Sequence, residues 1–123
     1  MPPFMSAPKL AERELITIEL ELHDNQWGWN FTKLETLLAD SDHKISLILL
    51  CNPHNPVGRV WTKAELMKLL ELAIKYDVWV CSDEIHCDLV LDKNSQHIPF
   101  ASINEEAAQS VYSCQVDHQL ALI

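Results

Sequence analysis

Polar side chains able to do chemistry stand where two apolar stretches of this sequence end. Asn55 lies in a loop with two Asn-Pro pairs that follows the apolar run 45–51, and Asp83 comes directly after the apolar run 78–82. Short apolar runs ended by Pro, Gly or charged residues are typical of buried strands. In open α/β sheets, ligands bind at the carboxyl ends of the strands. We therefore predict a ligand site at Asn55 and Asp83.

A predicted crossover helix positions these two strand ends. Thr62 and Glu65 have the spacing of a capping box, which is a signature of a helix start. From there, leucines recur at helical spacing to about Tyr76. A strand, a crossover helix and a second strand make a βαβ unit, whose strands are parallel. Asn55 and Asp83 are therefore expected at the same edge of one sheet.

The rest of the chain predicts further parts of the same layer. Residues 15–20 are rich in β-branched and apolar types, so we expect a strand there, next to the two strands above, and another at 111–114. Asn30 is a candidate cap for a helix over 31–39. Prolines argue against a helix or a central strand at residues 1–4. The predicted fold class is α/β with a mainly parallel sheet.

Three motifs occur in an order that resembles the large domain of fold-type I pyridoxal-phosphate enzymes, which include the class I and II aminotransferases. They are Cys51-Asn-Pro-His-Asn-Pro-Val-Gly-Arg-Val-Trp-Thr62, Ser82-Asp-Glu-Ile-His-Cys-Asp-Leu89 and His97-Ile-Pro-Phe-Ala-Ser102. The nearest branch is that of the cystathionine β-lyases, which are carbon–sulfur lyases. The ordered set is more specific than any single motif. The resemblance implies a partial three-layer sandwich, with residues 1–109 as part of the large domain and residues 110–123 as a divergent tail.

The resemblance also implies pyridoxal 5'-phosphate as cofactor and gives three residues a place around it. In the family, an Asn before Pro-x-Gly bonds the phenolic oxygen of the cofactor, and this Asn corresponds to Asn55. The family's Asp at the end of the later strand pairs with the pyridine nitrogen and corresponds to Asp83. A Tyr or His one helical turn further on lies near the same phenolic oxygen and corresponds to His86. A carboxylate at the nitrogen favours the protonated ring, which is the better electron sink.

Purely structural explanations exist for the same residues. Asp83 could cap the turn that follows it, the Asn-Pro pair of Asn55 is common in turns, and His86 could be a hydrogen-bonded structural residue. Glu84 is expected at a helix start or on the surface. No metal site is predicted, because no zinc pattern fits the spacing of the candidate ligands Cys51, His54, Cys81, His86 and Cys87.

The sequence lacks several features of the resembled family, above all one lysine. Those enzymes hold the cofactor as a Schiff base to a lysine that follows the stretch matching 111–114, and here no lysine follows Lys93. The family's phosphate-binding loop and its arginine for the substrate carboxylate are not found either. No catalytic residue is therefore assigned. The chain is expected to be a fragment of the large domain that is inactive alone.

The predicted function is accordingly that of a fragment of a pyridoxal-phosphate-dependent carbon–sulfur β-lyase. The parent enzyme would act on a small amino acid, either cystathionine or a cysteine conjugate, and the family implies a homodimer. Two alternatives stay open. An aminotransferase of the same fold would share Asn55 and Asp83, and a non-catalytic remnant would act by binding a full-length relative.

The composition argues against several other classes of function. A net charge of -9 disfavours nucleic acid and anionic membranes as partners. No apolar stretch reaches the roughly 18 residues of a membrane span, and the first residues lack the order of a signal peptide. Gly28 and Gly58 are the only glycines, which excludes a dinucleotide-binding GxGxxG loop. The four cysteines form no CxxC pair, so reduced thiols and a cytoplasmic location are expected.

Overall fold

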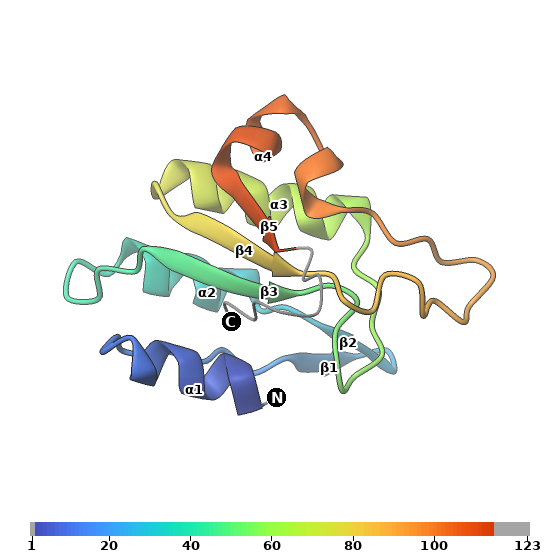
Figure 1. The fold of residues 1–123 in the computed structure, drawn as a ribbon, viewed down its shortest axis with the longest axis horizontal. Coiled ribbons are helices and arrows are strands. Elements are labelled where there is room, and N and C mark those ends of the chain that lie inside the picture. Colours follow the sequence, from blue (N-terminus) through green and yellow to red (C-terminus); the bar gives the residue numbers. More distant parts are fainter. Residues whose placement is uncertain (1, 115–123) are drawn as a thin grey trace.

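The computed structural model describes residues 2–114 (Figure 1). Among these residues no helix is long and apolar enough to cross a membrane. In chain order the elements are α1 (Pro2–Leu10), β1 (Glu21–His23), β2 (Gln26–Gly28), α2 (Phe31–Ala39), β3 (Leu47–Cys51), α3 (Lys63–Lys75), β4 (Trp79–Asp83), the 3-10 helix η1 (Phe100–Ser102), α4 (Glu105–Ser110) and β5 (Val111–Cys114).

A parallel sheet with the strand order β3-β4-β5 forms the centre of the fold. Leu47 pairs with Trp79 and Cys51 pairs with Asp83, so β3 and β4 begin and end level with each other. Both arrowheads point to the right in Figure 1, where the loop after each strand begins. The expected α/β fold with a parallel sheet is therefore confirmed.

The expected crossover helix is α3, which joins β3 to β4 and starts with a complete capping box. Thr62 Oγ1 accepts a hydrogen bond from the Glu65 N–H at 3.3 Å, and the Glu65 carboxylate accepts one from the Thr62 N–H at 2.7 Å. The buried face of α3 packs on Leu50 and Val80 of the sheet. That face consists of Leu66, Leu69, Leu70 and Ala73, whereas Leu72 is buried with Leu38 and Val78. The cap and the apolar face together hold α3 against β3 and β4.

The sheet is covered more fully on one face than on the other. Val80 is completely buried in the α3 core, whereas its neighbour Trp79 is 46% exposed and Leu47, opposite Trp79 in β3, is 47% exposed. Successive residues of a strand point to opposite faces, so the exposed pair lies on the face away from α3. The described residues thus form a sheet with its helical layer on the α3 side, in agreement with the expected partial sandwich.

The expectation of a strand at residues 15–20 is wrong. This segment has no ladder partner among the described residues, and pairing begins at Glu21 in the two-stranded hairpin β1-β2. Asp24 and Asn25 form its turn with φ values of 48° and 61°, as a tight hairpin requires. The β-branched composition of residues 15–20 favours extended backbone, but a strand also needs a neighbour to bond.

The expectation that residues 1–4 cannot begin a helix is also wrong. α1 begins at Pro2, with Pro3 in its first turn. The first N–H groups of a helix have no partner within the helix, and the fixed φ of proline suits these positions. The prolines therefore mark a helix start.

Two further expected elements are confirmed. α2 follows the cap Asn30, whose Oδ1 accepts a hydrogen bond from the Lys33 N–H at 2.8 Å. The predicted strand at 111–114 is β5, which pairs with β4. Most of the divergent tail expected at 110–123 lies outside the described residues, from position 115 onward.

The capping box gives a first testable prediction. Thr62→Ala should lower the free energy of unfolding by about 1 kcal/mol, because the Glu65 N–H loses its acceptor. Urea denaturation of both proteins measures this difference. Thr32→Ala is the matched control, since Thr32 is exposed in the first turn of α2, and it should change the free energy by less than about 0.5 kcal/mol. Equal losses in the two variants would contradict the assignment.

Candidate functional site

The carboxyl ends of β3 and β4 lie side by side and are joined by backbone hydrogen bonds. Cys51 is the ladder partner of Asp83, and the next residue, Asn52, donates its N–H to the Asp83 carbonyl at 2.9 Å. The two predicted site segments, the loop after Cys51 and the turn after Asp83, therefore leave the sheet from one edge. This edge is where parallel α/β sheets bind their ligands.

The loop between β3 and α3 is closed by its own hydrogen bonds. The N–H of His54 donates to the Arg59 carbonyl at 2.8 Å, and the N–H of Gly58 donates to the His54 carbonyl at 2.7 Å. Gly58 has a φ of 71°, which glycine adopts without steric cost. Trp61, which is fully buried, donates its indole N–H to the Cys51 carbonyl at 2.9 Å. These bonds fold the loop back on the end of β3.

Asn55 and His86 meet above this strand end. Asn55 Nδ2 lies 3.2 Å from His86 Nε2, although the two residues are 31 positions apart. With the amide nitrogen as donor, Nε2 is the acceptor in this pair. The backbone N–H of Asn55 donates to the sulfur of Cys51 at 3.4 Å. The place of Asn55 is therefore set by contacts from both strand ends.

Asp83 is the last residue of β4, opposite Cys51 in the ladder. Its Oδ1 accepts a hydrogen bond from the Ile85 N–H at 3.1 Å, which turns the chain away from β4. The pKa of the buried Cys51 thiol is raised, mainly by burial; the Asn55 N–H acts against this shift, and the nearby Asp83 carboxylate adds to it. Cys51 thus lies within electrostatic range of Asp83 and in contact with Asn55. The roles of Asn55, Asp83 and His86 toward a cofactor remain predictions.

Glu84 is not at a helix start or on the surface, so the expectation for this residue is wrong. Its side chain is only 6% exposed. One carboxylate oxygen accepts from Ser82 Oγ at 2.9 Å and from the Phe100 N–H at 2.8 Å, and the other lies 3.3 Å from His97 Nε2. Sequence reasoning missed it because the partners at 97–100 are distant in the chain. The motif His97-Ile-Pro-Phe-Ala-Ser102 was the available signal.

Asn52 provides a second tie to the same segment. It is fully buried, and its Nδ2 donates to the Ile98 carbonyl at 3.1 Å. The residues at 97–100 are thus bonded to β3 through Asn52 and to β4 through Glu84.

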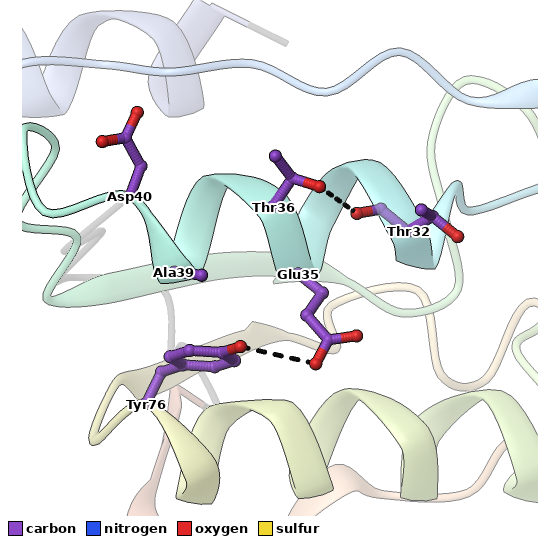
Figure 2. A pocket seen from close by; sticks show the side chains of 6 residues that line it. All are labelled: Thr32, Glu35, Thr36, Ala39, Asp40 and Tyr76. Atoms are coloured by element: carbon purple, nitrogen blue, oxygen red, sulfur yellow. Dashed lines mark hydrogen bonds between the residues drawn. The ribbon is translucent and has the colours of Figure 1, made fainter.

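A shallow hollow on the surface lies elsewhere, between α2 and the end of α3 (Figure 2). Its lining is Thr32, Glu35, Thr36, Ala39, Asp40 and Tyr76. The Glu35 carboxylate accepts from Lys75 Nζ at 2.6 Å and from the Tyr76 hydroxyl at 3.4 Å. The bond to Lys75 lowers the pKa of Glu35, and the same bond raises that of Lys75. Tyr76 precedes β4, so this hollow is at the opposite end of the strand from Asp83.

Within residues 2–114 no group of three or more His, Cys, Asp or Glu side chains could hold a metal ion. In the described part of the chain, Cys51 and Cys87 are free cysteines.

The parallel sheet, with α3 as the crossover between β3 and β4, defines the chain as an α/β protein with polar groups at the carboxyl ends of adjacent strands. The chain belongs to the aminotransferase class I and II family, whose model matches residues 2–115. Cystathionine beta-lyase PatB of Bacillus subtilis (strain 168) is 40% identical over 112 residues, which are 91% of this chain and 28% of that enzyme.

Solved structures of pyridoxal-phosphate enzymes have the same fold. Cystalysin from Treponema denticola, which contains a pyridoxal 5'-phosphate cofactor, matches with a TM-score of 0.80 and 42% identity over 89% of this chain and 27% of its own. The PLP-bound C-S lyase from Staphylococcus hominis matches with a TM-score of 0.77 and 32% identity, over 89% of this chain and 27% of its own. The chain thus spans little more than a quarter of each of these relatives. The predicted family and fold type are confirmed.

Half-buried His54 gives a testable prediction about the stability of the folded chain in acid. Its Nδ1 is buried without a hydrogen-bond partner in the described part of the chain, and its ring lies edge-on to Trp61 with centroids 5.8 Å apart. Burial lowers the pKa of His54 below its ordinary value, because the charged ring would lose its hydration. The unfolded chain therefore binds the proton more tightly than the folded one.

We expect the free energy of unfolding to fall as the pH drops below about 6.5, the ordinary pKa of histidine. His54→Phe keeps an aromatic ring beside Trp61 and removes the titrating group, so its stability should decline less steeply with acid. Urea denaturation between about pH 8 and about pH 5 measures both slopes. Identical slopes for the parent and His54→Phe would contradict the prediction.

Proposed function

We propose that this chain is part of a pyridoxal-phosphate-dependent carbon–sulfur β-lyase of the cystathionine β-lyase type. The observation that carries the proposal is the meeting of Asn55 and His86 at 3.2 Å beside the strand end that bears Asp83. The substrate class is an α-amino acid with a thioether at its β-carbon, such as cystathionine or a cysteine conjugate. Support for this branch comes from the similarity to cystathionine beta-lyase PatB and to the C-S lyase of Staphylococcus hominis.

The chemistry of the donor set suits a pyridoxal ring. When bound, the cofactor supplies an electron sink for the pair left when a bond at the substrate α-carbon breaks. Asp83 would hold a proton at the ring nitrogen, since a neighbouring carboxylate favours the cationic form. Asn55 would hydrogen-bond the phenolic oxygen, and His86 would flank that oxygen and fix the carboxamide of Asn55 through Nε2.

Cys51 is assigned a structural part at this edge. Its thiol donates to the Pro53 carbonyl at 3.3 Å and accepts from the Asn55 N–H, and burial raises its pKa. A protonated, buried thiol is a weak nucleophile. Cys51 therefore orients Asn55 and takes no part in bond making.

No lysine of this chain is in a position to carry the cofactor. All seven lysines are exposed, and four of them lie on α2 and α3. An amine that forms a covalent bond with the cofactor works in a pocket that keeps it neutral. We therefore propose that these 123 residues alone turn over neither cystathionine nor cysteine.

A second candidate function is transamination, because the matching family model is that of the class I and II aminotransferases. A non-catalytic chain that binds a full-length relative is the third candidate. For the whole protein we propose a homodimer in the cytosol, where the thiols of Cys51 and Cys87 would stay reduced.

Ligand binding tests the proposal, and the probe is pyridoxine 5'-phosphate, which has no aldehyde to react with exposed lysines. Asp83→Asn should weaken binding by about tenfold or more, because a hydrogen bond to a charged group contributes roughly 1.5–3 kcal/mol. Isothermal titration calorimetry of the purified chain measures both affinities. Asp88→Asn, at an exposed position five residues further on, is the control and should leave the affinity unchanged.

The outcomes separate the candidate functions. Equal affinities of the parent and Asp83→Asn would refute the cofactor role of Asp83. Cystathionine cleavage by the purified chain would refute its proposed inactivity, and capture of a full-length relative without any ligand binding would favour the non-catalytic alternative.

A further inference from the structure

We propose that Glu84 is the positioning residue of the strand-end site. Its buried carboxylate sets the direction in which the chain leaves β4, and so the places of Asp83 and His86. The inference rests on the proposed function only in naming these two residues as the site. The contacts of Glu84 are formed in the folded chain without any ligand.

Both oxygens of the Glu84 carboxylate are used. Oε1 accepts from Ser82 Oγ at 2.9 Å and from the Phe100 N–H at 2.8 Å, and Oε2 lies 3.3 Å from His97 Nε2. The side chains of Glu84 and His97 are 6% and 10% exposed. A carboxylate buried to this degree is stable only where donors surround it, so its direction is fixed by all three partners.

The bonds of Glu84 to His97 and Phe100 close a long loop of the chain. Residues 85–99 extend away from the sheet in Figure 1 and return to it at η1. This loop starts after Glu84 and ends near His97 and Phe100, so the Glu84 carboxylate holds the two ends of the loop together. Asn52 adds the bond to the Ile98 carbonyl from the end of β3.

Asp83 and His86 are close to Glu84 in the chain, and backbone hydrogen bonds link their positions to it. Asp83 precedes Glu84 and accepts the Asn52 N–H through its carbonyl at 2.9 Å. The Glu84 carbonyl accepts the Cys87 N–H at 2.9 Å, which closes the turn that brings His86 to Asn55. A change in the direction of Glu84 therefore rotates this turn and moves His86 away from Asn55.

Glu84→Gln is the variant that tests this inference with the least disturbance. Its amide oxygen still accepts from Ser82 and Phe100, but its amide nitrogen can only donate toward His97 Nε2. His97 would then have to carry its proton on Nδ1, which is buried without a partner among the described residues. The tie to His97 should fail while the other two bonds persist.

Nuclear magnetic resonance of the labelled chain reads the result without cofactor. In the parent we expect a nuclear Overhauser contact between the Asn55 carboxamide protons and the His86 ring, and in Glu84→Gln we expect its loss, with shifted His86 ring nitrogens. Glu35→Gln is the control, since Glu35 also bonds two side chains but lies on α2, and it should keep both signals.

Two milder variants keep the test decisive if Glu84→Gln does not fold. Glu84→Asp shortens the carboxylate, and Ser82→Ala removes one donor, so each should shift the His86 signals in the same sense by a smaller amount. Any folded Glu84 variant that keeps the Asn55–His86 contact and its shifts would overturn the proposal. If the parent fails to bind pyridoxine 5'-phosphate but Glu84→Gln moves His86, the proposed function fails and the positioning role stands.

Discussion

The level pairing of β3 with β4 is the constraint on which the candidate site depends. Cys51 faces Asp83 in the ladder, and the Asn52 N–H bonds the Asp83 carbonyl one step further on. A slip of this register by one residue would turn Asp83 toward the α3 core and move Val80 out of it. The apolar packing of α3 on Val80 and Leu50 therefore also determines which polar groups reach the edge of the sheet.

Buried polar groups then direct the loops that leave this edge. Trp61 bonds the Cys51 carbonyl, Asn52 bonds the Ile98 carbonyl and Glu84 bonds Ser82, Phe100 and His97. A buried donor or acceptor without a partner costs roughly 1–3 kcal/mol, so each such bond strongly favours one loop conformation. Asn55 and His86 meet because two loops, anchored separately, are both held in this way.

Local signals in the sequence predicted the parts of the fold that local physics determines. The capping box of Thr62 and Glu65, the Asn30 cap and the ends of β3 and β4 all follow from short patterns. The strand expected at 15–20 failed because pairing depends on a distant neighbour that composition does not reveal. The expectation for Glu84 failed for the same reason, since its partners at positions 97 and 100 lie at the other end of a long loop.

The central claim is that a pyridoxal ring would bind at the carboxyl ends of β3 and β4. Amide chemical shifts of the isotope-labelled chain, followed during titration with pyridoxine 5'-phosphate, test it most directly. If the ring binds there, the shifts should concentrate in residues 52–58 and 83–87, around Asn55 and Asp83. Shifts confined to the hollow of Figure 2, at residues 32–40 and Tyr76, would contradict it.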